Sequence, residues 1–216
     1  MEGKDMEYNA LKQGIYNYTE EELFYHDYYN ARQDPKELQH FLNNLDMDMV
    51  LENHRLIIEK PETIPEKFLD SYFFDLSNND SIVIQKHARY SPAIKHSHTF
   101  FEIAFVYDGK CHQNISGQNI ELRTGDICIV PPGIEHSISV FDDTIVFNVM
   151  LRRDTLHSMF YSFLNTSNIL SSFFLNNIYS KKANDYIIFH TGEDDTIKES
   201  FIRMYWESTN RQLYYY

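Results

Sequence analysis

The sequence predicts a mostly β domain with helices before and after it, an α+β arrangement in which short strands form a sandwich or barrel. Between Ser81 and Leu151, short apolar runs alternate with turn residues at roughly ten-residue spacing, which is typical of such β architectures. On both sides of this stretch, apolar residues recur with the period of an α-helix. The 216-residue chain is 43% hydrophobic and 15% aromatic, so it can build a packed core around the strands.

Short helices are expected in the first 80 residues. Thr19 and Glu22 have the spacing of a capping box and lead into an aromatic stretch. Asp34 and Pro35 supply a capping residue followed by proline at the first helical position. Residues 66–75 are expected to add one or two helical turns. The apolar face of the helix that begins at Pro35 is formed by Leu38, Phe41, Leu42 and Leu45.

Seven strands are expected in the central stretch, each bounded by turn or breaker residues. Asp108 and Gly109 form a strong hairpin signal directly after a long apolar run. Pro131, Pro132 and Gly133 interrupt a second run of buried-looking residues. The expected strands are 82–84, 100–107, 111–115, 120–122, 127–130, 137–141 and 144–151.

The helical period returns after Leu151. Two helical pieces separated at 165–168 carry Leu156, Phe160, Phe163, Leu170 and Phe174. Residues 186–189 suggest a short extended segment, and residues 197–208 a final amphipathic helix. The segments 155–180 and 196–212 hold more apolar surface than the flank of a barrel needs, so we expect a homodimer through them. Because the chain stops at Tyr216 inside an apolar helical pattern, a covering partner or a truncated chain is expected.

Composition excludes several functional classes. The formal charge is -13, and residues 1–80 hold 18 acidic against 7 basic residues. Such a chain lacks the positive surface that neutralises phosphates, so no nucleic acid binding by this chain alone is expected. The two cysteines, Cys111 and Cys128, exclude a disulfide framework, and no apolar run or leader pattern indicates a membrane segment or secretion. A cytoplasmic protein is expected.

One group of residues could bind a metal ion or a ligand. His96, His98 and Glu102 follow the pattern H-x-H-x-x-x-E, and their shared parity places them on one face of a strand. His136 lies 34 positions after Glu102, at the end of the pattern G-x(5)-P-x-G-x-x-H that begins at Gly125. If neighbouring strands bring them together, three imidazoles and one carboxylate form a ligand set for a divalent transition metal such as Zn, Ni or Fe.

The same parity predicts a pocket. If His96, His98 and Glu102 face inward, other residues of the same parity on the two strands face inward with them, giving a mostly apolar cavity with a few polar groups. A small-molecule effector is the expected occupant. The predicted effector-binding residues are His96, His98, Phe100, Glu102, Ala104, Val106, His136 and Ile138.

These two patterns resemble the two cupin motifs, with full spacing from His96 to Gly109 and from Gly125 to His136. Tyr90 stands where the first motif commonly begins with Gly, and Val140 where the second often ends with Asn. The resemblance implies a cupin-like double-stranded β-helix, or jelly-roll barrel. It divides the chain into an acidic helical segment at 1–79 that packs on the barrel, the cupin barrel at 80–152, and a helical dimerisation segment at 153–216.

The larger arrangement is similar to the N-terminal half of AraC-type transcription regulators. The resemblance rests on acidic helices, then HSHTFFEIAFVYDGK and GDICIVPPGIEHSI, then Phe-rich helices. It implies an effector-sensing, dimerising, non-enzymatic domain. The basic half with two helix-turn-helix units that binds DNA in that family is missing here.

Other functions stay open. A metal-dependent cupin enzyme, an isomerase or a dioxygenase, would use His96, His98, Glu102 and His136 as ligands. A metal-free stand-alone binding module is a third reading. The four residues could equally line an effector pocket without metal, or form a satisfied core without function.

Overall fold

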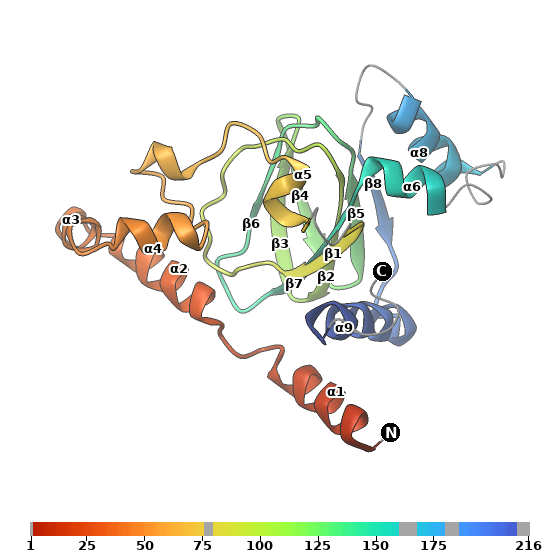
Figure 1. The fold of residues 1–216 in the computed structure, drawn as a ribbon, viewed down its shortest axis with the longest axis horizontal. Coiled ribbons are helices and arrows are strands. Elements are labelled where there is room, and N and C mark those ends of the chain that lie inside the picture. Colours follow the sequence, from red (N-terminus) through yellow and green to blue (C-terminus); the bar gives the residue numbers. More distant parts are fainter. Residues whose placement is uncertain (1, 76–79, 160–167, 180–185, 211–216) are drawn as a thin grey trace.

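The computed structural model describes residues 2–75, 80–159, 168–179 and 186–210. Two antiparallel sheets face each other at its centre (Figure 1). The five-stranded sheet has the order β1-β7-β2-β5-β8, and the three-stranded sheet has the order β4-β3-β6. The strands are β1 (Ile82–Lys86), β2 (Phe101–Asp108), β3 (Lys110–Ile115), β4 (Gln118–Arg123), β5 (Asp126–Val130), β6 (His136–Ser139), β7 (Ile145–Leu151) and β8 (Ile187–His190).

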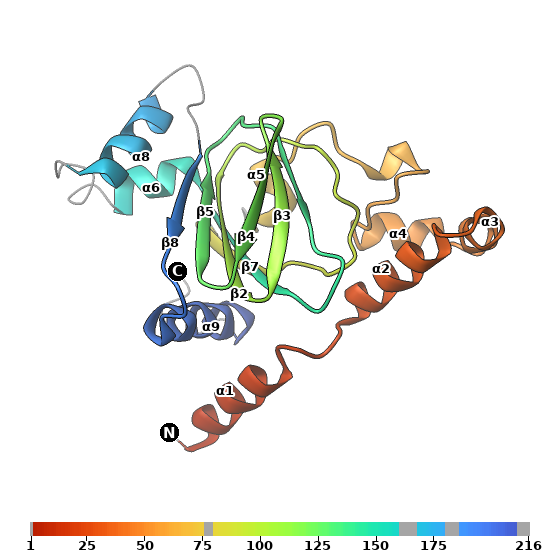
Figure 2. The same ribbon diagram turned by 180° about the vertical axis from the view of Figure 1, so that it is seen from behind.

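The predicted class, strands with helices before and after, is confirmed, and each of the seven expected strands is present within a few residues. The predicted barrel takes the form of two sheets, because the described strands do not hydrogen-bond into one closed ring. Figure 2 shows the smaller sheet from the side opposite to Figure 1.

The helices before the sheets begin where side chains can cap them. The side chain of Thr19 accepts a hydrogen bond from the Glu22 backbone, and the Glu22 carboxylate accepts one from the Thr19 backbone, so the predicted capping box is confirmed. Asp34 caps the next helix, as predicted. The elements are α1 (Glu2–Gly14), α2 (Glu20–Ala31), α3 (Pro35–Asn43), α4 (Met47–Glu52), a 3-10 turn (Pro61–Thr63) and α5 (Asp70–Phe73).

The elements after the sheets are α6 (Arg153–Met159), α8 (Ile169–Tyr179), β8 and α9 (Asp195–Asn210). The helical positions expected at Phe160 and Phe163, the break expected at 165–167, and the chain end at Tyr216 lie outside the described residues. No helix within the described ranges combines the length and the apolar character that crossing a membrane requires.

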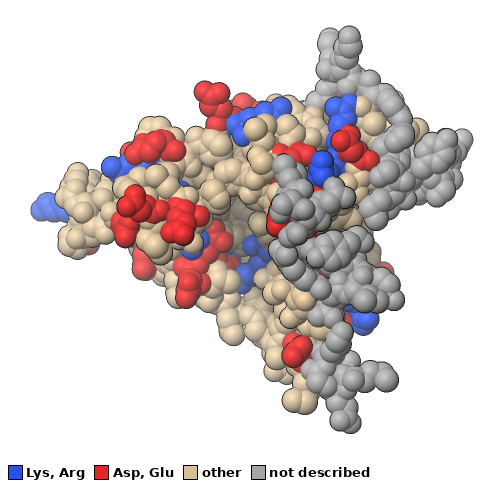
Figure 3. Space-filling view, viewed as in Figure 1, with Lys and Arg blue, Asp and Glu red and all other residues tan. Residues whose placement is uncertain are grey.

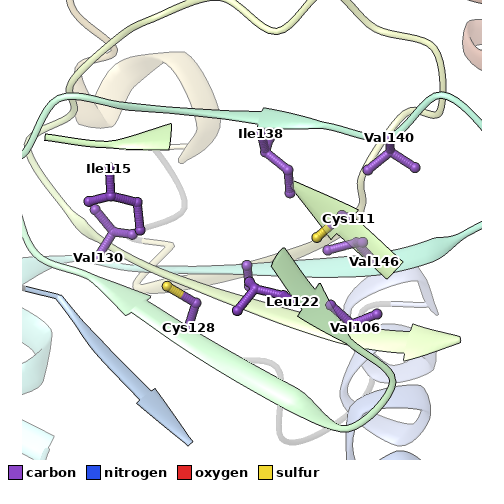
Figure 4. Close-up of a cluster of buried hydrophobic side chains, with 10 residues drawn as sticks. Val106, Cys111, Ile115, Leu122, Cys128, Val130, Ile138, Val140 and Val146 are labelled. Atoms are coloured by element: carbon purple, nitrogen blue, oxygen red, sulfur yellow. The ribbon is translucent and has the colours of Figure 1, made fainter. Parts of the chain in front are cut away.

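Strand β2 separates two apolar regions, because successive side chains along a strand point to opposite faces of the sheet. Its odd-numbered residues face helices: the Phe101 ring contacts Phe174 of α8 at 5.3 Å, and Phe105 stacks on Phe201 of α9 at 4.1 Å between ring centroids. Its even-numbered residues face the smaller sheet, where Val106 lies in the apolar cluster between the sheets (Figure 4). The inner face of β2 therefore also carries Glu102.

A buried ion cluster joins α2 to the end of β1. Glu22 is fully buried, and its carboxylate accepts hydrogen bonds from Arg89 Nε at 2.8 Å and from Lys86 Nζ at 2.9 Å. The Arg89 guanidinium also lies 3.8 Å from the centre of the Tyr18 ring. The N-terminal helices are thus fixed to the sheet by buried charges.

Strand β8 was expected only as an extended segment, yet it pairs with β5 and extends the larger sheet. The pairing brings Gly125, which has φ +88°, against Gly192: a Cβ on Gly125 would come 1.8 Å from the Gly192 carbonyl oxygen. Only glycine tolerates both the left-handed conformation and this approach.

Replacing Gly125 by Ala is expected to lower the free energy of unfolding by at least about 2 kcal/mol, because the added methyl group would collide with the Gly192 backbone and force it to move. Gly117→Ala is the matched control, with φ +85° and nothing within 4 Å, and should cost about 1 kcal/mol from backbone strain alone. Urea unfolding of both variants measures the difference. If both variants lost the same free energy of unfolding, the close contact between Gly125 and Gly192 would add no steric cost.

Candidate functional site

Backbone pairing brings the two histidine motifs together. His96 and His136 form an isolated antiparallel bridge in which each backbone N–H donates to the carbonyl of the other at 2.9 Å. His98 lies in a parallel bridge with Phe68, and Glu102 is the second residue of β2. Residues far apart in the chain therefore converge at one end of the sheets.

The side chains of the four predicted residues meet around the Glu102 carboxylate. Its Oε2 lies 3.2 Å from His136 Nε2 and 3.3 Å from His98 Nε2. The His96 ring lies 4.4 Å from the His136 ring, and one ligand atom each from His96, Glu102 and His136 lie within 4.8 Å of one another. The predicted cluster therefore forms.

Backbone carbonyls fix the orientation of all three imidazoles. The Nδ1 atoms of His96, His98 and His136 lie 2.9, 2.7 and 3.2 Å from the carbonyl oxygens of residues 94, 100 and 134. Because a carbonyl can only accept, each Nδ1 carries a hydrogen and each Nε2 is directed elsewhere. Metal-binding histidines are commonly held in this way.

The Nε2 atom of His98 is buried and has no hydrogen-bond partner among the described residues. It faces the same carboxylate oxygen as His136 Nε2, and two imidazole lone pairs do not attract an anion. A proton on one imidazole makes that imidazole a donor to the carboxylate, but the other contact stays unfavourable. A metal cation bound between the imidazole nitrogens and the carboxylate oxygen would make both contacts favourable. His96, Glu102 and His136 thus offer a ligand set that fits a divalent transition metal, with His98 Nε2 directed at the same carboxylate.

Charges within the cluster shift its pKa values in different directions. Burial alone would raise the pKa of Glu102, but the imidazoles of His136 and His98 outweigh it and hold the pKa well below its usual range. Burial lowers the pKa of His136, but the hydrogen bond to Glu102 reverses this and raises it. Burial and the neighbouring His136 lower the pKa of His96 to about 4. The metal-free cluster at neutral pH is an ionised Glu102 beside a neutral His96.

The metal-free chain should lose stability as the pH falls through the range in which His96 protonates. The unfolded pKa of histidine is about 6.5 and the folded pKa is about 4, so stability is complete above the first value and is lost as the pH falls toward the second. The loss between pH 7 and pH 4 should be about 3 kcal/mol larger in the wild type than in His96→Gln. Urea unfolding in the presence of a chelator measures it. If the free energy of unfolding changed with pH equally in the wild type and in His96→Gln, His96 would not be buried in its neutral form.

A cavity of about 670 Å³ opens beside the cluster, between the larger sheet and the N-terminal segment. His96, Phe100, Glu102 and Ile138 of the predicted site lie on its wall. His98 and His136 are buried behind this wall. Ala104 and Val106 lie in the apolar cluster between the sheets rather than on the wall, although Ala104 lies opposite Asn148, which does reach the cavity.

The sequence analysis missed the polar part of the wall. It is formed by Gln85, His87, Ser91 and Asn148, and the N-terminal segment adds Tyr25, His54, Phe68, Tyr72 and Phe73. A signal existed for Asn148, which interrupts the apolar strand β7 at an inward-facing position. Gln85 lies within β1, and His87 and Ser91 follow that strand. Tyr25, Tyr72 and Phe73 come from helices α2 and α5, so their approach to one cavity depends on tertiary packing.

Acidic residues predominate around this cavity. Glu20, Glu21 and Glu102 lie on its wall, whereas the one lysine or arginine among the described wall residues is Lys86, already bound to Glu22. Figure 3 shows acidic side chains gathered over helices α2 to α4, next to a hollow in the surface.

Residues 78–152 match the family model described as the AraC-like ligand binding domain. No curated protein sequence is significantly similar to the chain. Similar solved structures include an RmlC-like cupin from Shewanella frigidimarina (23% identity, covering 34% of this chain and 68% of that chain, TM-score 0.31). A cupin protein from Bacteroides fragilis is 25% identical (33% and 64% covered, TM-score 0.28). ToxT from Vibrio cholerae O395, bound to a naphthalenyl butenoic acid, is 13% identical (62% and 49% covered, TM-score 0.39), so the match spans about half of that chain.

Proposed function

We propose, from the match of residues 78–152 to the AraC-like ligand binding domain, that the chain senses a small molecule for an AraC-family transcriptional regulator in the cytoplasm. The observation that carries the proposal is the cavity of about 670 Å³ with His96 and Glu102 on its wall. Its volume lies within the range of small-molecule sites, and its wall combines aromatic surface with a few polar groups. DNA contact, in this proposal, belongs to helix-turn-helix units outside residues 1–216.

The position of the cavity suggests how sensing works. Glu102 and Asn148 lie on the sheet, whereas Tyr25 and Tyr72 lie on the N-terminal segment, so a ligand contacts both at once. A ligand shifts a conformational balance only by its difference in affinity for the two states. A ligand that bridges sheet and helices favours the state in which they are held together.

The proposal is tested by thermal unfolding of the chain against a library of metabolites. A ligand at a hundred times its Kd adds about 2.7 kcal/mol, or roughly 5–10 °C in Tm for a chain of this size. Gln85→Trp fills the cavity from the centre of β1, and we expect it to abolish the shift. Gln118→Trp, at an exposed position of β4, is the matched control. A shift that survives in Gln85→Trp would place the ligand elsewhere.

We further propose a homodimer through α8 and α9. Phe174 and Ile178 of α8 pack on the larger sheet, while Ile169 at its start is 79% exposed and Met204 on α9 is 39% exposed. At ~100 μM protein, even a Kd of ~10 μM gives mostly dimer. We expect sedimentation equilibrium to show a dimer that Ile169→Lys weakens, with Met6→Lys on the exposed face of α1 as control. Only monomer at that concentration would contradict the proposal.

A second candidate function is a metal-dependent cupin enzyme, favoured by the convergence of His96, His98, Glu102 and His136. Bound there, a metal would polarise an oxygen of a substrate in the adjacent cavity. The chain itself would orient that substrate against Phe100 and would limit water around Glu102. Turnover by the metal-loaded chain that is lost in Glu102→Gln would favour the enzyme over the sensor.

A further inference from the structure

A polar row crosses the inner face of the larger sheet next to Glu102. Gln85 of β1 lies directly opposite Asn148 of β7, which lies opposite Ala104 of β2. Gln85 is exposed although it lies in the middle of a strand, because its side chain faces the cavity. The small side chain of Ala104 leaves room beside Asn148.

Hydrogen bonds orient the amide of Asn148. Its Nδ2 lies 3.5 Å from His87 Nδ1, and His87 Nε2 lies 3.3 Å from Ser91 Oγ. Burial lowers the pKa of His87, so the imidazole is neutral and its Nδ1 accepts while its Nε2 donates. Asn148 Oδ1 is left buried and without a hydrogen-bond partner among the described residues. Such an acceptor is costly unless another donor reaches it.

The charges of the wall limit what can supply that donor. Glu20, Glu21 and Glu102 lie on the wall, and Lys86 is held by Glu22 and by the backbone carbonyls of Ile15 and Asn17. No described lysine or arginine on the wall is left to pair with an anion. In the metal-free chain, a carboxylate or phosphate ligand would therefore be desolvated beside like charge.

The remaining wall is aromatic. Phe68, Tyr72 and Phe73 contact one another from the N-terminal segment, and Phe73 contacts Phe100 of the sheet at 5.5 Å between centroids. This surface suits an apolar carbon skeleton. The cavity thus offers an aromatic surface on one side and, on the other, a polar surface that includes the unpaired acceptor Asn148 Oδ1.

We infer that the ligand of this cavity is an uncharged amphiphilic alcohol, whose hydroxyl donates to Asn148 Oδ1 beside Gln85 and whose carbon skeleton lies on the aromatic wall. The inference rests on the proposed sensing function and names the class of its ligand. In this arrangement His87 is a positioning residue that holds the Asn148 amide.

Hexanediol and hexanoate are matched six-carbon probes, one with hydroxyl donors and one with a carboxylate. In ¹⁵N-labelled full chain, hexanediol is expected to shift the Asn148 side-chain amide resonance saturably, and hexanoate is not. Asn148→Leu should weaken hexanediol binding about tenfold or more. The ligand-free Tm of that variant should be unchanged or higher, because the unpaired acceptor is removed. Asn9→Leu, at an exposed position of α1 outside the cavity, should change neither quantity.

Three results would overturn the inference. Hexanoate could bind as tightly as hexanediol in a manner that Gln85→Trp abolishes; the sensing function would then survive and the ligand class would fall. Asn148→Leu could lower Tm and leave hexanediol binding intact, which would make the amide structural. Absence of any hexanediol response up to its solubility limit would also refute the assigned class, and absence of any library response as well would remove the sensing function with it.

Discussion

Glu22→Ala is expected to lower the free energy of unfolding by about 3–5 kcal/mol. The substitution removes the buried carboxylate that pairs with Lys86 and Arg89, and it leaves Arg89 with the exposed carboxylate of Asp143. The Arg89 side chain is 1% exposed and that of Lys86 is 6% exposed. Burial would raise the pKa of Glu22, but hydrogen bonds from Arg89 and Lys86 outweigh it and lower that pKa. The substitution also removes half of the capping box at the start of α2.

Glu21→Ala is the matched control for this prediction. Glu21 pairs with Arg55 at 2.9 Å, yet its side chain is 46% exposed, so the loss should stay below about 1 kcal/mol. Urea unfolding at neutral pH, with both variants measured beside the wild type, gives the comparison. Equal losses would mean that burial of the Glu22 cluster has no energetic consequence.

Addition of Zn²⁺ or Ni²⁺ is expected to raise the free energy of unfolding by about 4 kcal/mol when free metal exceeds its Kd a thousandfold. The reason is the unpaired Nε2 of His98 and the anionic Glu102, which a cation would satisfy together. Glu102→Gln and His136→Ala should each remove most of this gain. His112→Ala is the control, since His112 and Glu121 form a comparable pair at 3.4 Å on the surface.

Calorimetric titration of the chelator-treated chain measures the metal affinity directly. One equivalent bound by the wild type and by His112→Ala, but not by the two cluster variants, is the expected result. Equal binding by all four proteins would assign the metal to surface groups. The cluster would then be polar lining of the cavity.

Local signals predicted much of this fold. The Thr19–Glu22 box and the Asp34–Pro35 start specify α2 and α3 because caps act within one turn of the chain. Turn residues such as Gly109 delimit the strands, and alternation in β2 assigns Phe101 and Glu102 to opposite faces. The meeting of the His96 and His136 motifs was expected from the resemblance of the two patterns, taken together, to the cupin motifs.

Other features depend on tertiary contacts that local patterns do not encode. Pairing of β8 with β5 brings Gly192 next to Gly125, although the two residues are far apart in the sequence. No short-range signal specifies that pairing. His87 follows a strand end, so its direction depends on Ser91 and Asn148. The expectation that Ala104 and Val106 line the pocket assumed that every inward residue reaches the cavity, whereas these two side chains pack in the apolar cluster between the sheets.

Native mass spectrometry of the chain purified with its bound small molecules tests the central claim, that this cavity binds the ligand, most directly. One small molecule per chain should be retained by the wild type and by Gln118→Trp, and lost from Gln85→Trp at unchanged Tm of the ligand-free proteins. Equal retention by Gln85→Trp, or no retained or added molecule on any of the three proteins, would contradict a ligand-sensing cavity between the sheet and the N-terminal helices.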